Sequence, residues 1–209
     1  MTVRVFAVCF AVLGWVSTPA HAVIEAMVLG GPNASTISAT KTTTLATQTS
    51  SAYLGFQAGV GLGLPLLSRS LILESQVFYT DRVLADSSTI YTFHSLHNPL
   101  LARFRFSESF SIAAGPFQEF SLWSVGAKKK SSDALAPLNS TVSYEDASLK
   151  KNQYGFEGSM QFKFPSGGSQ FLLDLRYYKT LVNVSRIASV KRLFSGAQVN
   201  IGMLWGAGK

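Results

Sequence analysis

The segment from Gln153 to Phe164 alternates in chemical character at almost every position. One set of positions is apolar or aromatic apart from a single glycine: Tyr154, Phe156, Gly158, Met160, Phe162 and Phe164. The set between them is polar, charged or glycine: Gln153, Gly155, Glu157, Ser159, Gln161 and Lys163. Successive side chains of a β-strand point to opposite faces, so this period of two predicts a strand with one apolar and one polar face.

The same alternation recurs along the chain. Five further segments follow it: Leu54–Leu64, Leu71–Thr80, Leu100–Phe106, Phe171–Tyr178 and Ser195–Trp205. The segment from Phe110 to Trp123 is less regular, and Gly115 followed by Pro116 indicates a bulge or an edge-like irregularity there. A weaker opening strand at Ile24–Gly30 completes a predicted set of eight strands.

The connections between these strands alternate in length. Three are short and rich in Pro, Gly or Ser: Pro65–Arg69, Ser107–Ser109 and Pro165–Ser169. Four are long: Gly31–Ser50, Asp81–His94, Ser124–Lys151 and Val182–Lys191. Short periplasmic turns and long external loops are typical of outer-membrane barrels. The sequence therefore predicts an all-β fold, an eight-stranded antiparallel up-and-down transmembrane β-barrel.

The N-terminal residues predict export. Arg4 is followed by an apolar run, Val5–Val16, and by Ala20-His21-Ala22, which has the A-x-A form of a signal-peptidase site. We therefore expect residues 1–22 to be a cleavable signal peptide and residues 23–209 to form the barrel domain.

The composition limits the cellular compartments in which the exported chain is expected to reside. Hydrophobic residues make up 47% of the sequence, yet after the signal no stretch approaches the ~18 apolar residues of a spanning helix. The one cysteine, Cys9, lies in the signal, so disulfide chemistry is not expected. Charged residues are only 14%, too few for a soluble basic nucleic-acid binder despite the net charge of +7. These features favour the outer membrane of a Gram-negative bacterium, where closed barrels span lipid.

Aromatic residues lie near both ends of the predicted strands. Those toward the loop side are Tyr53, Tyr79, Trp123, Tyr154 and Tyr177. Those toward the turn side are Phe106, Phe110, Phe164 and Trp205. Two such bands predict girdles that face lipid at the membrane interfaces. A water-soluble barrel of the lipocalin type is the alternative, with its apolar face inside.

The opposite face of the strands carries charges of both signs. The predicted inward residues are Glu74, Glu119, Glu157 and Asp174 against Arg103, Arg105, Lys163 and Arg176, with Glu25 as a further candidate. Isolated buried charges are costly, so we expect a paired network. An eight-stranded barrel is only wide enough for its side chains to fill. The sequence thus predicts a plugged lumen, in which Gly55, Gly59, Gly61 and Gly63 leave space for the arginines.

Sites for other chemistry are few. Gly59-x-Gly61-x-Gly63 lacks the spacing and the helix of a phosphate loop. Lys128, Lys129 and Lys130 are interpreted as a solvated loop, with contact to lipopolysaccharide or a partner as the alternative. The catalytic candidates are His94, Ser95 and His97, but adjacent strand residues point to opposite faces. No catalytic residues, metal or cofactor are therefore predicted.

Several segments resemble one family of bacterial proteins. EAMVLGGPNASTIS resembles the opening strand and first loop of the PorT-like outer-membrane β-barrel family. LHNPLLARFRF and the following SFSIAAGPFQEF are similar to its P-L-L-x-x-Y/F-x-F and AGP strands, and LLDLRYYKTLVNV to its arginine-tyrosine strand. The resemblance covers nearly all of the mature chain. It implies an outer-membrane barrel, with a few members tied to protein secretion.

The leading functional hypothesis is a non-enzymatic barrel that serves envelope structure or presents its loops to a partner. Its expected partners are outer-membrane lipid, lipopolysaccharide and a protein reached through the external loops, and no nucleic acid. A secretion-accessory barrel, a small channel and a lipid A-modifying enzyme are the alternatives. A channel needs an open lumen, and an enzyme needs a nucleophile with a base and an orienting acid.

Overall fold

The computed structural model describes residues 24–41, 44–45, 47–49, 51–66, 70–85, 89–129, 135–137, 149–166 and 168–206. The predicted signal peptide at residues 1–22 and Lys130 lie outside the described residues. Among the residues described, no helix has the length and hydropathy to cross a membrane.

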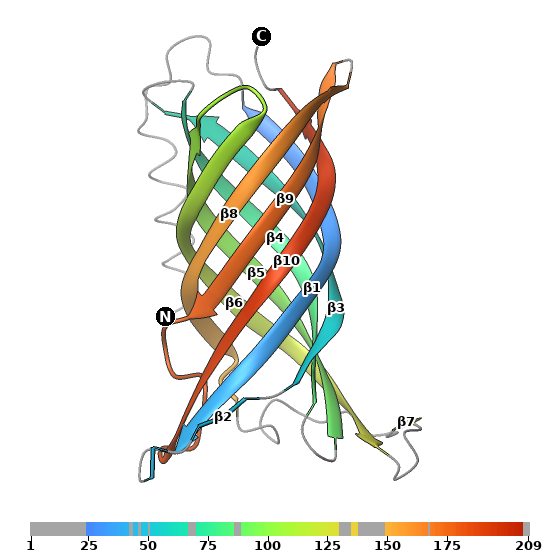
Figure 1. Ribbon diagram of the computed structural model, residues 1–209, viewed down its shortest axis with the longest axis vertical. Helices are drawn as coiled ribbons and strands as arrows, with labels where there is room; N and C mark the ends of the chain where they lie inside the picture. The colour runs from blue at the N-terminus through green and yellow to red at the C-terminus, as the bar shows by residue number, and fades with distance from the viewer. Residues whose placement is uncertain are drawn as a thin grey trace.

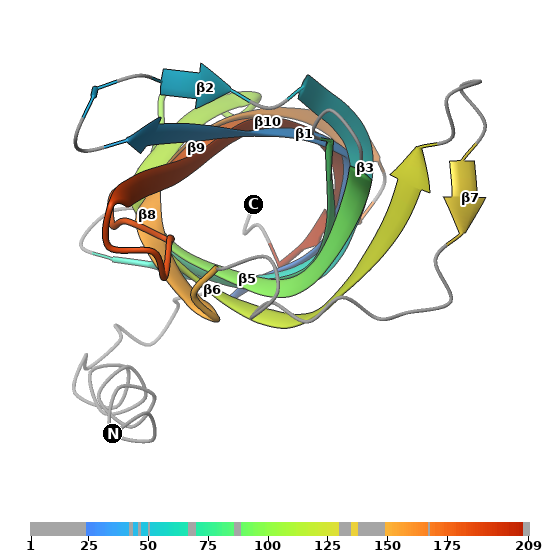
Figure 2. The same cartoon turned by 90° about the horizontal axis from the view of Figure 1, so that it is seen from below.

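In the described part of the chain, eight long strands form a closed antiparallel barrel (Figures 1 and 2). They are β1 (Glu25–Lys41), β3 (Ser51–Pro65), β4 (Leu71–Ala85), β5 (Thr89–Arg105), β6 (Phe110–Lys129), β8 (Asn152–Ser166), β9 (Ser169–Thr180) and β10 (Val190–Trp205). Each pairs with the next along the chain, and two short strands, β2 (Thr47–Thr49) and β7 (Leu135–Pro137), pair with β1 and β6. The predicted eight-stranded up-and-down barrel is confirmed.

Pairing between the first and last long strands closes the barrel. The β1–β10 ladder runs from Ala26 opposite Trp205 to Lys41 opposite Val190. Because the wall is closed, the strands pair their backbone donors and acceptors with one another, as a hydrocarbon environment requires. Figure 1 shows β2 and β7 at the end of the barrel that carries the long connections.

The strands at this end are longer than predicted. β1 continues to Lys41 through the predicted loop Gly31–Ser50, and β4 and β5 cover most of the predicted loop Asp81–His94. The alternation of apolar and polar residues fades there because lipid no longer covers the outer face, while backbone pairing continues. Those two connections are therefore largely extended hairpin. The predicted loop at Val182–Lys191 agrees closely with the residues between β9 and β10.

Of the two alternatives predicted at Gly115 and Pro116, the bulge is wrong and an irregularity is present. Both residues pair in regular register with Glu157 and Phe156 of β8, but the pairing with β5 is interrupted at them, between Phe117 opposite Pro99 and Ala114 opposite Ala102. The bulge lies further along β6, where Ser121 pairs with Ser95 but Trp123 pairs with His94, which leaves one extra residue. An extra residue reverses the inward and outward positions beyond it, and it places Trp123 on the outer face beside His94.

The outer face of the barrel is apolar. Large side chains midway along the strands stand exposed, among them Val60, Phe156 and Ile201. Such a continuous apolar surface would be unfavourable in water and matches the band that an outer-membrane barrel presents to lipid.

The interior contains apolar clusters as well as charges. One cluster, toward the loop end, consists of Phe93, Phe117, Leu149, Tyr178, Val184 and Phe194. The other contains Met27, Leu29, Phe78, Leu172 and Leu204. The expectation of a charged interior is thus incomplete, because a narrow barrel is filled like a protein core and uses apolar side chains where no partner for a charge is available.

Candidate functional site

The interior charges form one candidate site, which begins at Arg103 of β5. Arg103 is fully buried, and its Nε donates to Oε1 of Glu74. Its Nη2 donates to Glu74 Oε2 at 2.8 Å and to Ser159 Oγ at 3.2 Å, and its Nη1 to Ser111 Oγ at 3.3 Å. The bidentate contact with Glu74 joins β4 and β5, and the serines extend it to β6 and β8.

Arg176 of β9 is the centre of a second group. Its Nε donates to Asp174 Oδ2 at 2.8 Å, and its Nη1 donates to Glu157 Oε1 at 2.9 Å and to Gln76 Oε1 at 2.7 Å. Its guanidinium also lies over an aromatic face, with Cζ 4.8 Å from the centre of the Phe78 ring. A serine links this group to the first, because Ser159 Oγ donates to Asp174 Oδ1 at 2.8 Å.

A third group lies toward the loop end. His97 Nε2 is 2.6 Å from Glu157 Oε2, and His97 Nδ1 is 3.3 Å from Glu119 Oε2. Glu119 also forms an ion pair with Arg82. The Arg82 guanidinium lies 4.4 Å from the centre of the Tyr178 ring. The network of charged side chains therefore ends at the apolar cluster that contains Tyr178, at the loop end of the lumen.

The remaining predicted charges lie at the turn end of the lumen. Arg105 Nη2 donates to Glu25 Oε1 at 2.5 Å, and the Arg105 side chain is partly exposed. Lys163 is buried near this pair, but its Nζ makes no hydrogen bond to any residue that the structure describes. The structure thus brings seven of the eight predicted lumen residues into ion pairs and leaves Lys163 outside them.

Sequence reasoning misses two members of the network, Arg82 and His97. Arg82 lies in a segment expected to be a loop, and His97 stands out in the sequence only as a catalytic candidate. Both obey the alternation of inward and outward side chains along their strands. Arg82 faces inward, as Phe78 and Thr80 do at every second position before it. His97 faces inward, as Arg103 does further along the same strand. Extending the period of two beyond the predicted strand ends is the signal that finds them.

The hypothesis that glycines leave space for the arginines is wrong. A side-chain carbon at Gly59 would meet the Phe78 ring at 2.6 Å, and one at Gly61 would meet Gln76 at 2.7 Å. At Gly63 the nearest side chain is Ile72, at 3.1 Å. The aromatic, amide and aliphatic side chains of β4 cover these glycines, because the adjacent strand is closer than the opposite wall.

The catalytic candidates do not assemble into a triad. His94 points outward, with Nδ1 2.6 Å from Asp81 Oδ1 and its ring stacked on Trp123 at 4.9 Å. Ser95 is buried in the lumen, where both ring nitrogens of His97 contact carboxylates and neither is left to activate it. Within the described ranges, no group of three or more His, Cys, Asp or Glu is placed to hold a metal ion.

The predicted girdle residues all lie on the outer face and are exposed: Tyr53, Tyr79, Trp123, Tyr154, Phe164, Tyr177 and Trp205. Tyr79 is joined to its neighbours, with its ring centre 6.3 Å from Trp123 and its hydroxyl 2.8 Å from His94 Nδ1. Rings of this kind place an apolar body in lipid and a polar group at its surface.

Solved structures with which this chain shares similarity are bacterial surface proteins. Neisserial surface protein A, from Neisseria, is 11% identical with a TM-score of 0.44, over 87% of this chain and 98% of that one. Ail of Yersinia pestis, in complex with the heparin analogue sucrose octasulfate, is 11% identical with a TM-score of 0.46, over 87% and 99%. OprG from Pseudomonas aeruginosa is 12% identical with a TM-score of 0.44, over 88% and 97%. No curated protein sequence matches the chain.

One family model matches most of the sequence. It describes an outer membrane protein beta-barrel domain, and the match runs over residues 23–186. This range includes every long strand of the barrel except β10, which closes it against β1. The chain therefore belongs to the outer membrane protein beta-barrel domain family and is a protein of the bacterial outer membrane.

Proposed function

We propose that this protein is a non-enzymatic barrel that supports the cell envelope and presents its extended hairpins to a partner outside the cell. The observation that carries this proposal is the filled lumen. Buried side chains occupy it from Glu25 at the turn end, through Arg103 and Arg176, to Phe194 at the loop end.

The mouth of the lumen is covered by the connections as well as by the strands. Leu149 and Val184 come from the segments next to β8 and β9, and both are buried against the aromatic cluster of Phe93, Phe117 and Phe194. The backbones of the two segments are joined, because Lys150 N donates to Val184 O at 2.8 Å. The two segments thus form an apolar cap over the charged layer below.

A filled lumen leaves the external hairpins as the surface for recognition. β4 and β5 remain paired up to Ala85 opposite Ile90, and β2 and β7 lie outside the ring of the barrel at the same end (Figure 2). We infer that a protein partner or lipopolysaccharide contacts this end. The resemblance to PorT-like proteins supports placing the chain with them inside the wider family, where secretion accessories occur. Crosslinking from Lys128 in cells tests for such a partner.

The filled lumen predicts a barrel that does not conduct. Refolded protein inserted into a planar bilayer is expected to give no steady current steps, because ions would have to displace paired charges and the apolar cap. A porin prepared in the same way serves as the positive control. Steady single-channel steps from the pure protein would contradict the plugged barrel.

From the surroundings of Ser95 we expect that the protein does not modify lipid A. Lipid A from a strain that lacks the gene is expected to have the same mass spectrum as lipid A from the parent strain. The physical reason is that two carboxylates hold both ring nitrogens of His97, so the imidazole cannot activate Ser95 as a base. The non-enzymatic role would be wrong if the spectrum changed and the wild-type gene restored it while Ser95→Ala did not.

A further inference from the structure

Cations gather at the outer end of β8 and β9. Residues 149–156 and 175–187 contain no Asp or Glu. Their cations are Lys150, Lys151, Arg176, Lys179 and Arg186. Arg176 turns into the lumen and forms ion pairs there. The other four stand at the loop end of this sector of the wall, and a cluster of cations attracts anionic groups.

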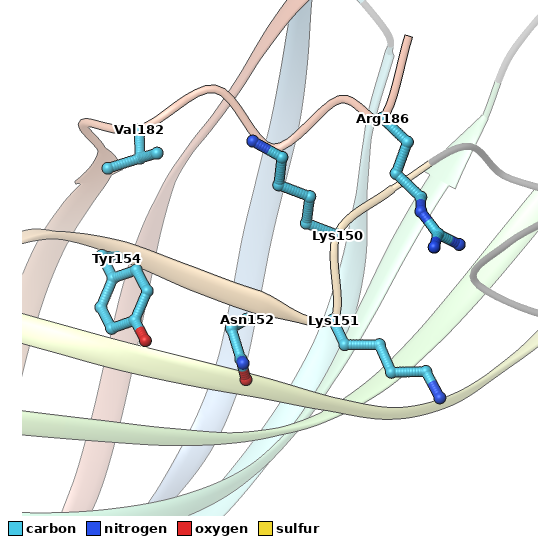
Figure 3. Close-up of a pocket in the computed structure, with 6 residues that line it drawn as sticks. All are labelled: Lys150, Lys151, Asn152, Tyr154, Val182 and Arg186. Carbon is cyan, nitrogen blue, oxygen red and sulfur yellow. The ribbon is translucent and has the colours of Figure 1, made fainter. Parts of the chain in front are cut away.

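One groove is lined by three of these cations, Lys150, Lys151 and Arg186. The fourth, Lys179, lies on the wall beside the groove. These four residues are called the basic rim. The groove has a volume of about 590 Å³ and is lined by Lys150, Lys151, Asn152, Tyr154, Val182 and Arg186 (Figure 3). Lys150 Nζ donates to Asn183 O at 2.9 Å, which holds that ammonium group against the groove wall. The groove thus has a cationic side and, at Tyr154 and Val182, an apolar side.

The fourth member of the basic rim, Lys179, connects the groove to the lipid-facing wall. Lys179 lies opposite Phe156 across the β8–β9 ladder, two residues beyond Tyr177 on the same outward face. Leu181 N donates to Tyr154 O at 3.0 Å, so the pairing continues to the edge of the groove. Within one step the outer face changes from aromatic to cationic, which is the order of chemistries at a bilayer surface with anionic headgroups.

We propose that the basic rim binds the phosphate groups of a lipid A-type glycolipid in the outer leaflet. Its sugars would fill the groove beside Tyr154, and its acyl chains would lie along the wall at Phe156. This inference deepens the proposed function and rests on its orientation, with the long hairpins outside. A membrane lipid is favoured over a soluble polyanion because the groove places exposed aliphatic side chains beside its cations: Leu181 and Val182 are 66% and 48% exposed. A soluble polyanion would leave these aliphatic side chains uncovered.

The test compares two variants that lose the same charge. The basic-rim variant, Lys151→Gln/Lys179→Gln, removes two cations of the basic rim. The control variant, Lys41→Gln/Lys191→Gln, removes two exposed cations at the loop end of the β1–β10 ladder. Native mass spectrometry of the refolded barrel in detergent measures binding of bisphosphorylated lipid A and of its dephosphorylated form. The basic-rim variant is expected to bind bisphosphorylated lipid A about tenfold more weakly, as for the loss of two partly exposed ion pairs. The control variant is expected to bind as the wild type does.

Three results would overturn the assignment. One is equal binding of bisphosphorylated lipid A by the wild type and the basic-rim variant. Another is binding of the dephosphorylated form by the wild type as tightly as the bisphosphorylated form. The third is a loss of sucrose octasulfate binding in the basic-rim variant while lipid A binding is kept, which would assign the rim to a soluble polyanion. Arg186→Gln repeats the test in a loop residue if the strand variant does not refold. None of these results alters the bilayer conductance, measured without lipid A, so the filled-lumen proposal is tested separately.

Discussion

Replacing Arg103 by alanine is expected to lower the free energy of unfolding of the barrel by about 3–5 kcal/mol. The substitution leaves the buried Glu74 carboxylate without its bidentate partner and removes the contacts to Ser111 and Ser159. A buried carboxylate that loses its paired cation costs more than an exposed one, because water cannot replace the lost contacts. Urea unfolding in lipid vesicles, followed by tryptophan fluorescence, measures the loss.

The comparison for Arg103 lies on the same strand. Arg105 is 19% exposed and forms one contact with Glu25, which is 3% exposed, so Arg105→Ala leaves a buried carboxylate that loses fewer contacts than Glu74 does, and we expect a cost of about 2 kcal/mol. Adding Glu74→Gln to Arg103→Ala is expected to restore part of the stability, since it removes the unpaired charge. Unchanged urea midpoints and unchanged gel mobility of unheated samples in both arginine variants would show that the network does not stabilise the barrel.

The alternation of side chains predicted the part of the fold that lipid covers. From Tyr154 to Phe164 every outward position must suit hydrocarbon and every inward position must suit a narrow core, so the pattern has few exceptions. The strand type, the facing of each side chain and the number of strands follow from it. The inward position of Glu74, Glu157 and Asp174 is a direct consequence, because each directly follows an apolar residue that faces outward.

The part beyond the lipid was predicted less well, because the outer face there carries no hydrocarbon constraint. Asp81 and Arg82 read as loop residues, although both belong to β4 and Arg82 enters the lumen. The extra residue that brings Trp123 to the outer face has no local sign in the sequence, since a bulge depends on pairing with a distant strand. Contacts between distant segments, such as the cap of Leu149 and Val184, have no local signature at all.

Gly155→Ala is expected to destabilise the barrel by about 3 kcal/mol, the upper range for overpacking a filled core. A side-chain carbon at this position would meet the backbone oxygen of Lys179 at 2.3 Å and the Phe117 ring at 2.5 Å. The carbonyl belongs to the β8–β9 ladder and the ring to the apolar cluster under the cap, so relief requires a shift of strand β9 as well as of Phe117. Gly158→Ala, on the same strand, is the control: its nearest atom is Ala113 O at 3.9 Å, and we expect unchanged or slightly higher stability. Urea midpoints of the two variants in the same vesicles make the comparison, and equal midpoints would mean that Phe117 and β9 are not packed against Gly155 as tightly as the structure shows.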